Sequence, residues 1–197
     1  RTSGPSGRFG TEPDATRQRN VVLIGGGSGI TPLISIVRSL VAREPRSRVT
    51  LVYGNRDRES IIFGDELEEL AERLDAFTVR HVLEEPPDGW EGERGLVAGD
   101  VLERTVPIAA NAEYFICGPG PMMDGVVEFL GGQSVDDDRI HLERFVPASS
   151  DGLSEAEGRV HSVRFARSGT MLQVRDDQTL LEAGRAAGIP MRFSCSM

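Results

Sequence analysis

Lysine is absent from this chain, since all 22 basic residues among its 197 are arginine. A Walker A phosphate loop and Schiff-base chemistry both need a lysine, so neither operates within these residues. Cysteine is scarce as well, with Cys117 and Cys195 alone. Two thiols are too few for a disulfide scaffold or a complete zinc site, and they indicate a reducing, cytoplasmic setting.

Long apolar runs and an excess of positive charge are also missing. No stretch of the sequence approaches the roughly 20 apolar residues that cross a bilayer. The net charge is −9, whereas a protein that binds the phosphate backbone of a nucleic acid needs a basic face. We therefore expect neither a membrane nor a nucleic acid among the partners.

Short β-branched runs alternate with amphipathic patterns in the larger part of the chain. Strands are predicted at 20–25, 48–54, 77–83, 113–118 and 140–145, and helices at 32–41, 67–74, 97–106 and 121–130. Thr31 is placed to cap the first helix, and Pro32 suits its first position. This alternation predicts an α/β fold with a five-stranded parallel sheet flanked by helices.

The composition changes near the end of this region. Residues 147–158 are small and acidic without apolar periodicity, which is typical of a linker. Two alternating strands at 159–166 and 170–175 follow, and then a helix at 179–188. Three such elements enclose too little core to be stable alone, so segment 159–197 is predicted to be part of a domain.

The segment IGGGSGITP, residues 24–32, lies between the first strand and the first helix. Glycines let the backbone approach a ligand closely, and a helix N-terminus favours an anion, so this segment indicates a pyrophosphate site. A tight strand-to-helix turn is the alternative. The usual G-x-G-x-x-G fingerprint is not met, because Ile30 stands where a small residue is needed. The candidate residues are Gly25, Gly26, Gly27, Ser28, Gly29, Ile30, Thr31 and Pro32.

A second candidate segment is YFICGPGPMM, residues 114–123, which puts Cys117 at the carboxyl end of a buried strand. Ligands bind at that edge of an open α/β sheet, and the two prolines after the cysteine make the turn rigid. The alternative is that Cys117 serves only as a small apolar residue of the core.

Together these segments resemble the nucleotide domain of the ferredoxin-NADP reductase superfamily. The resemblance covers residues 4–146 and depends on GGGSGITP, YGNRDRESIIFGDEL, Gly95 before LVAGDVL, and CGPGPM. It implies an NAD(P)-binding domain at 10–146, and GPSGRF resembles the tail of a flavin domain at 1–9. It also implies that Gly25 to Thr31 bind the pyrophosphate. The residues implied to hold the nicotinamide are Cys117, Gly118, Pro119 and Met122, and Gly120 is a further candidate for cofactor binding.

The exit of the second strand bears on the choice between NADH and NADPH. An acid there favours a ribose hydroxyl, whereas arginine accommodates a 2′-phosphate. Asp57 offers the first signal, while Arg56, Arg58 and Ser60 offer the second and favour NADPH. The alternative is a solvated, charged loop without a role in binding.

The end of the chain resembles the first half of a plant-type [2Fe–2S] ferredoxin domain, which has a β-grasp fold. Cys195 would then be the first cluster ligand, and the other cysteines of the C-x4-C-x2-C pattern would follow Met197. On this interpretation the chain is a truncated fragment. The alternative is that Cys195 is an idle thiol.

The resemblance implies an electron-transfer reductase that supplies an oxygenase or another one-electron acceptor protein. NAD(P)H gives two electrons as hydride and an iron–sulfur cluster accepts one, so FAD is expected between them. Cys117 is predicted to position the nicotinamide for hydride transfer. Two rival hypotheses are a nucleotide-sensing module without chemistry and a cysteine hydrolase using Cys117, which would need a histidine base. The histidines His81, His141 and His161 are instead predicted to face solvent.

Overall fold

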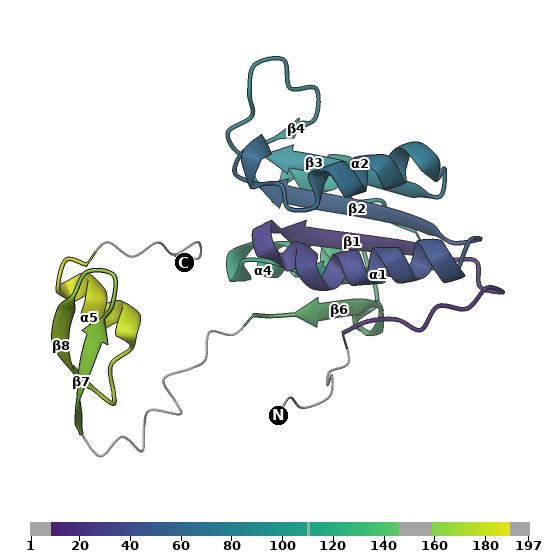
Figure 1. Cartoon of the computed structure of the whole chain (residues 1–197). Coiled ribbons are helices and arrows are strands. Elements are labelled where there is room, and N and C mark those ends of the chain that lie inside the picture. Colours follow the sequence, from purple (N-terminus) through teal and green to yellow (C-terminus); the bar gives the residue numbers. More distant parts are fainter. Residues whose placement is uncertain (1–8, 110, 146–158, 190–197) are drawn as a thin grey trace. The chain divides into compact units, whose positions relative to one another are not determined.

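The computed structural model of the chain describes residues 9–109, 111–145 and 159–189. The chain divides into two compact units, one ending at Phe145 and the other starting at Val146 (Figure 1). The division falls at the start of the predicted linker, and the linker itself and residues 190–197 lie outside the described residues. No helix in the described ranges is long and apolar enough to cross a membrane.

The first unit is built on a six-stranded sheet in the order β4-β3-β2-β1-β5-β6, and every neighbouring pair is parallel. Its strands are β1 (Asn20–Gly26), β2 (Arg48–Asn55), β3 (Phe77–Leu83), β4 (Glu93–Arg94), β5 (Ala112–Cys117) and β6 (Ile140–Glu143). Five strands were predicted. The sixth, β4, has two residues within a polar loop, which is too short for any apolar pattern to reveal.

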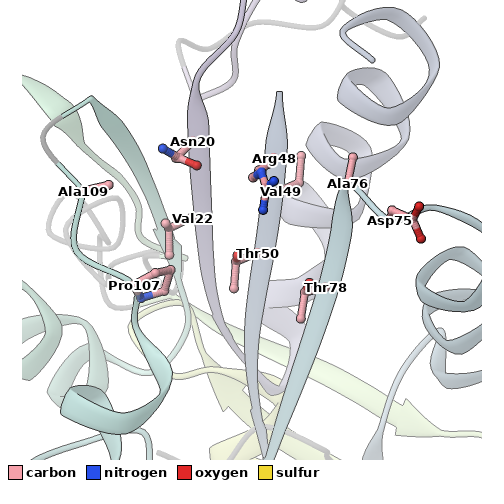
Figure 2. Close-up of a pocket in the computed structure, with 10 residues that line it drawn as sticks. All are labelled: Asn20, Val22, Arg48, Val49, Thr50, Asp75, Ala76, Thr78, Pro107 and Ala109. Carbon is pink, nitrogen blue, oxygen red and sulfur yellow. The ribbon is translucent and has the colours of Figure 1, made fainter. Parts of the chain in front are cut away.

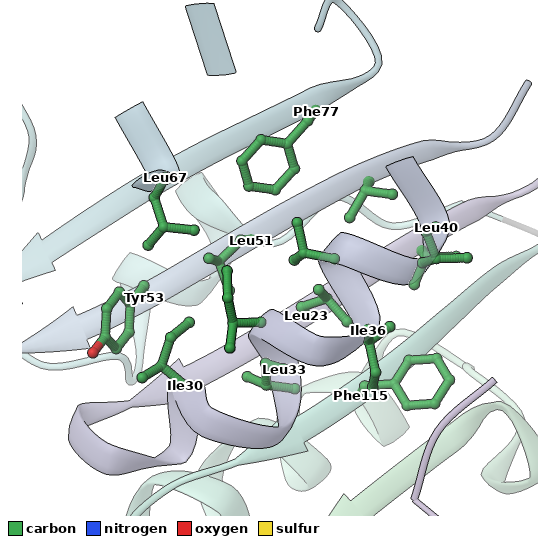
Figure 3. Packing of buried hydrophobic residues seen from close by; sticks show 14 of the residues in the cluster. Leu23, Ile30, Leu33, Ile36, Leu40, Leu51, Tyr53, Leu67, Phe77 and Phe115 are labelled. Atoms are coloured by element: carbon green, nitrogen blue, oxygen red, sulfur yellow. The ribbon is translucent and has the colours of Figure 1, made fainter. Parts of the chain in front are cut away.

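Helices cover both faces of this sheet. They are α1 (Ile30–Arg43), α2 (Gly64–Arg73), α3 (Asp100–Thr105) and α4 (Gly120–Gly132), with short 3-10 turns η1 (Gly27–Gly29), η2 (Arg58–Ser60) and η3 (Asp137–Arg139). Successive residues of a strand point to opposite faces. Leu23 therefore packs under α1 in one apolar layer (Figure 3), and Ile24 packs in the second layer, which includes residues of α3 and α4.

The start of α1 differs from the prediction. The helix begins at Ile30, one residue before Thr31, and Gly29 occupies the N-cap position without a side-chain cap. The Thr31 hydroxyl instead donates to the Ser28 carbonyl oxygen at 2.9 Å, and Pro32 is the third helical residue. The prediction was wrong because η1 leads directly into α1, which leaves no extended residue before the helix.

A buried carboxylate fastens the segment before β1 to the end of α1. Glu44 has a fully buried side chain and accepts hydrogen bonds from Arg19 Nε at 2.8 Å, from Ser47 Oγ at 2.6 Å and from the Asp14 backbone N–H at 3.1 Å. Earlier in the same segment, the Phe9 ring lies edge-on to Phe115, with 5.7 Å between the ring centroids. These contacts hold residues 9–19 against the rest of the first unit.

The second unit consists of β7 (Val160–Phe165), β8 (Thr170–Arg175) and α5 (Leu180–Ala186) in its described part. Both strands were predicted, and they pair antiparallel. Thr179 caps α5 in a capping box with Glu182, which satisfies backbone N–H groups at both positions. Val174 and Ala183 are its buried apolar side chains among the described residues.

Candidate functional site

The two glycine-rich segments meet at one edge of the sheet. From β1 the chain moves through β2, β3 and β4 on one side, and it then returns to add β5 and β6 on the other side. The sheet order therefore reverses between β1 and β5, and in open α/β sheets ligands bind outside the carboxyl ends of the strands at such a switch point. Gly25 on β1 is paired with Cys117 on β5 at this point.

The backbones of the two segments are too close for intervening side chains. A Cβ atom on Gly29 would collide with the carbonyl group of Cys117. A Cβ atom on Gly26 would lie 2.8 Å from both Met122 Sδ and Pro119 Cδ, and one on Gly118 would lie 2.6 Å from Met122 Cε. The segment predicted to hold the pyrophosphate therefore lies in direct contact with the segment predicted to hold the nicotinamide.

Two helices begin at this edge. The 14-residue α1 starts directly after Gly25 to Gly29, here called the glycine loop. The helix α4 starts at Gly120 with Pro121 in its first turn. The first N–H groups of a helix have no partner within the helix, and its dipole places partial positive charge there. Both helices thus offer an electrostatic environment that suits an anionic ligand.

Tyr53 holds the glycine loop in place through a hydrogen bond from the sheet. This residue of β2 is fully buried, and its hydroxyl donates to the Gly27 carbonyl oxygen at 2.9 Å. Gly27 has φ +51°, a left-handed conformation that residues with a side chain rarely adopt. Sequence reasoning missed Tyr53, because an apolar-looking position within a strand gives no sign of the loop that its hydroxyl reaches.

The thiol of Cys117 faces the core. Its side chain is fully buried in the apolar layer under α1, and burial, with a smaller contribution from the charge of Glu143, raises its pKa to about 11. The thiol is therefore protonated at neutral pH. The part of Cys117 that lines the switch point is its backbone carbonyl, next to Gly29.

His141 does not provide the base that a cysteine hydrolase needs. Its Nε2 lies 2.7 Å from Glu113 Oε2, and its ring stacks on Phe115 with 4.5 Å between centroids. His141 was predicted to face solvent, but it is only partly exposed because the edge strand β6 lays it across Phe115. A protonated buried thiol without an imidazole partner argues against the hydrolase hypothesis.

His81 also differs from the prediction, whereas the exposure of His161 is confirmed. Both ring nitrogens of His81 are buried beside Tyr53 and have no hydrogen-bond partner in the described part of the chain, and burial lowers the pKa of this histidine. The same lack of partners holds for both amide atoms of Asn55, the last residue of β2. Alternation along a strand could not reveal this burial. Charges on Glu68 of α2 and Arg58 of η2 act on His81, so segments elsewhere in the sequence form its surroundings.

The exit of β2 is organised around Asp57. Its carboxylate accepts hydrogen bonds from the Ser60 backbone N–H at 2.9 Å, from the Ser60 hydroxyl and from Arg56 Nε at 2.9 Å. Those bonds hold the pKa of Asp57 below its ordinary value. Arg58 is exposed on η2. Two of the three residues predicted to grip a 2′-phosphate are thus already engaged with a carboxylate.

A separate cavity of about 230 Å³ opens at the opposite edge of the sheet (Figure 2). Asn20, Thr50 and Thr78 line it near the amino ends of β1, β2 and β3, together with Pro107 and Ala109. It lies away from the switch point and contains none of the predicted site residues.

The predicted metal ligand, Cys195, lies outside the described residues. Within residues 9–109, 111–145 and 159–189, no group of three or more histidine, cysteine or acidic side chains could hold a metal ion. The cluster prediction therefore depends on the sequence pattern alone.

Comparison with known proteins gives this architecture a family. The profile of the oxidoreductase NAD-binding domain matches residues 23–128, which include both glycine-rich segments. The chain belongs to this family. The sheet and its helices are those of an oxidoreductase NAD-binding domain, so the predicted fold class is confirmed.

Three relatives illustrate the similarity. The ferredoxin reductase component of 3-ketosteroid-9-alpha-monooxygenase from Mycobacterium tuberculosis is 35% identical over 97% of this chain and 53% of its own length. One component of the 1,2-phenylacetyl-CoA epoxidase of Escherichia coli is 31% identical over 97% of this chain and 56% of its own. The cytochrome P450 reductase GcoB of Amycolatopsis has a TM-score of 0.65 and 32% identity, covering 74% of this chain and 44% of its own. The chain thus spans about half the length of the curated relatives it matches.

Proposed function

We propose that the first unit binds NAD(P)H across the switch point between β1 and β5. The observation that carries this proposal is the contact between the two predicted segments, in which Gly29 lies against the Cys117 carbonyl and Gly26 against Met122 and Pro119. A dinucleotide lying along this edge would reach both segments. The match to the oxidoreductase NAD-binding family supports the same conclusion.

The two segments would divide the ligand between them. The residues from Gly25 to Thr31, at the start of α1, would bind the pyrophosphate through backbone N–H groups. The turn formed by Gly118, Pro119 and Gly120, with Met122 behind it, would hold the nicotinamide. Cys117 would act by shaping the backbone at this point and not as a nucleophile, because its protonated thiol is buried.

The whole protein would then be an electron-transfer reductase. FAD would be bound mainly by a flavin domain, of which residues 1–9 would be the tail. It would accept the hydride and pass electrons on singly. Residues 159–197 would belong to a [2Fe–2S] domain with Cys195 as a ligand, and an oxygenase or a similar protein would be the final acceptor. The similarity to a monooxygenase component and an epoxidase component over 97% of this chain supports this proposal.

We propose NADH as the preferred nucleotide, in place of the NADPH that the sequence favoured. The Asp57 carboxylate already accepts hydrogen bonds from the Ser60 hydroxyl and from one N–H group of Arg56. Its negative charge would also repel a 2′-phosphate. A ribose 2′-hydroxyl could donate to the same carboxylate. Arg58 and the other N–H donors of Arg56 would remain to favour NADPH.

Titration calorimetry of this chain with NADH and with NADPH tests the proposal. We expect NADH to bind more tightly than NADPH. The substitution Asp57→Asn removes the negative charge and should therefore reduce the difference between the two dissociation constants. If neither NADH nor NADPH bound at millimolar concentration, the proposed function would be contradicted.

Electron transfer needs a second measurement, made on the protein that includes the flavin domain. NADH-dependent reduction of ferricyanide is expected from a reductase. If the nucleotide bound without any such activity, the protein would be a sensing module instead.

A further inference from the structure

We propose that Tyr53 is a positioning residue that holds the glycine loop in its ligand-binding conformation. This inference rests on the proposed function, because it concerns the pyrophosphate part of the same site. The Tyr53 hydroxyl lies between two loops: it donates to the Gly27 carbonyl oxygen at 2.9 Å and accepts from the Ile62 backbone N–H at 3.4 Å. It therefore joins the predicted pyrophosphate loop to the loop after β2.

The burial of Tyr53 makes these hydrogen bonds important. The side chain is fully buried in the apolar layer under α1, where a hydroxyl without partners would be costly. Burial raises the pKa of Tyr53 above its ordinary value, so the hydroxyl stays protonated and remains a donor. Its proton is directed at the Gly27 carbonyl oxygen.

The geometry of the peptide unit connects this bond to the ligand. In a trans peptide, the carbonyl oxygen and the following N–H point in opposite directions. Because the Gly27 carbonyl oxygen faces the buried Tyr53 hydroxyl, the Ser28 N–H points away from that hydroxyl. This is the direction from which an anion would approach the start of α1.

Gly27 makes the loop depend on this restraint. An added Cβ atom would meet no atom within 4 Å, so the glycine is needed for its φ of +51° and not for lack of space. Glycine populates both signs of φ readily, so its peptide can rotate unless hydrogen bonds hold it. The Gly27 carbonyl oxygen already accepts from the Ile30 backbone N–H within η1, and the Tyr53 hydroxyl adds a second bond that ties the same oxygen to the sheet. A rotated peptide would present the Gly27 carbonyl oxygen to the phosphates and repel them.

The other tyrosine of the chain provides a matched control. Tyr114 is also fully buried, and its hydroxyl donates to the Pro107 carbonyl oxygen at 3.1 Å and accepts from the Ala109 N–H at 3.4 Å. These partners lie beside the cavity at the opposite edge of the sheet. Tyr53→Phe and Tyr114→Phe thus remove equivalent hydroxyl groups, one at the site and one far from it.

The experiment measures the dissociation constants of NADH and of ADP for the 197-residue chain and both variants, together with their free energies of unfolding. We expect Tyr53→Phe to weaken binding of both ligands about fivefold, the equivalent of one net hydrogen bond, and Tyr114→Phe to leave it unchanged. Both variants should lose similar stability, so stability alone cannot explain a difference in affinity.

Equal affinities for Tyr53→Phe and Tyr114→Phe would overturn the inference, while failure of the unaltered chain to bind NADH would instead overturn the proposed function. If Tyr53→Phe does not fold, Gly27→Ala disturbs the same bond from the loop side, with Gly131→Ala in α4 as its control, since a Cβ atom has free space at both glycines. Gly27→Ala must then weaken binding and Gly131→Ala must not, or the inference is wrong.

Discussion

Glycines of the predicted phosphate loop serve different purposes that the sequence could not separate. Gly26 and Gly29 leave room for the neighbouring turn after β5, so their missing side chains serve close packing. Gly27 has open space and a positive φ, so its role is conformational. The pattern of residues 24–32 predicted a ligand loop as a whole, but the roles of Gly26 and Gly29 depend on a segment about 90 residues away in the sequence, and that of Gly27 is tied to Tyr53 on β2.

The buried thiol of Cys117 gives a prediction for alkaline pH. Its folded pKa of about 11 lies above the ordinary value of 9.0, so between these values the unfolded chain loses the proton first. The free energy of unfolding should therefore fall as pH rises from about 9 to about 11. Urea unfolding at several pH values measures this loss of stability. In Cys117→Ala the part of the loss that comes from ionisation of the thiol should be absent.

Reactivity offers an independent check on the same thiol. In a Cys195→Ser background, iodoacetamide at mildly alkaline pH should modify Cys117 only after the chain is unfolded, because the thiolate is the reactive form. Rapid modification of the folded chain would mean that the thiol is exposed or ionised.

Side-chain partners set the limit of prediction at this scale. The sequence singled out Asp57 and Ser60 but could not tell that they bond to each other, because the conformation of η2 brings them together. The role of Tyr53 was missed for the same kind of reason. The partners of its hydroxyl come from the glycine loop and from the loop after β2, which no local pattern on β2 describes.

Elements with a strong apolar period were predictable, and short ones were not. The five longer strands and four helices of the first unit follow their patterns closely because buried faces enforce the period. The two-residue β4 and the start of α1 were not foreseen. In both, backbone hydrogen bonding decides the structure without an apolar pattern.

The connection between α1 and the segment before β1 yields a further prediction. Glu44→Gln should reduce the free energy of unfolding by about 2 kcal/mol, because the charge-assisted hydrogen bond from Arg19 is weakened in a buried place. Glu69→Gln removes an exposed ion pair with Arg73 and should cost less than about 0.5 kcal/mol. Similar losses in the two variants would contradict the role given to Glu44.

The pH dependence of the Glu44 variant follows from the same contacts. Burial alone would raise the pKa of this carboxyl, but hydrogen bonds from Arg19, Ser47 and Asp14 hold it below its ordinary value of 4.5. The unfolded chain therefore binds a proton first as pH falls, and stability is lost on acidification. Glu44→Gln should show a smaller loss between neutral and acid pH.

At the scale of the whole molecule, the first unit contains every residue proposed to contact the dinucleotide. A chain ending at residue 145, where the two units divide, should bind NADH with the same dissociation constant as the 197-residue chain. Calorimetry on both chains measures this. A tenfold weaker constant for the shorter chain would mean that the second unit contributes to the site.

The position of β1 in the sheet has a consequence for how the protein is made. This strand is synthesised first in the sheet but ends in its middle, with β2 on one side and β5 on the other. A ribosome must extend the chain as far as residue 117 before the second edge of β1 acquires its neighbour. Until then, the nascent chain carries an apolar strand with one unpaired backbone edge. We therefore expect the chain to be most prone to aggregation, and most dependent on chaperones, during this interval.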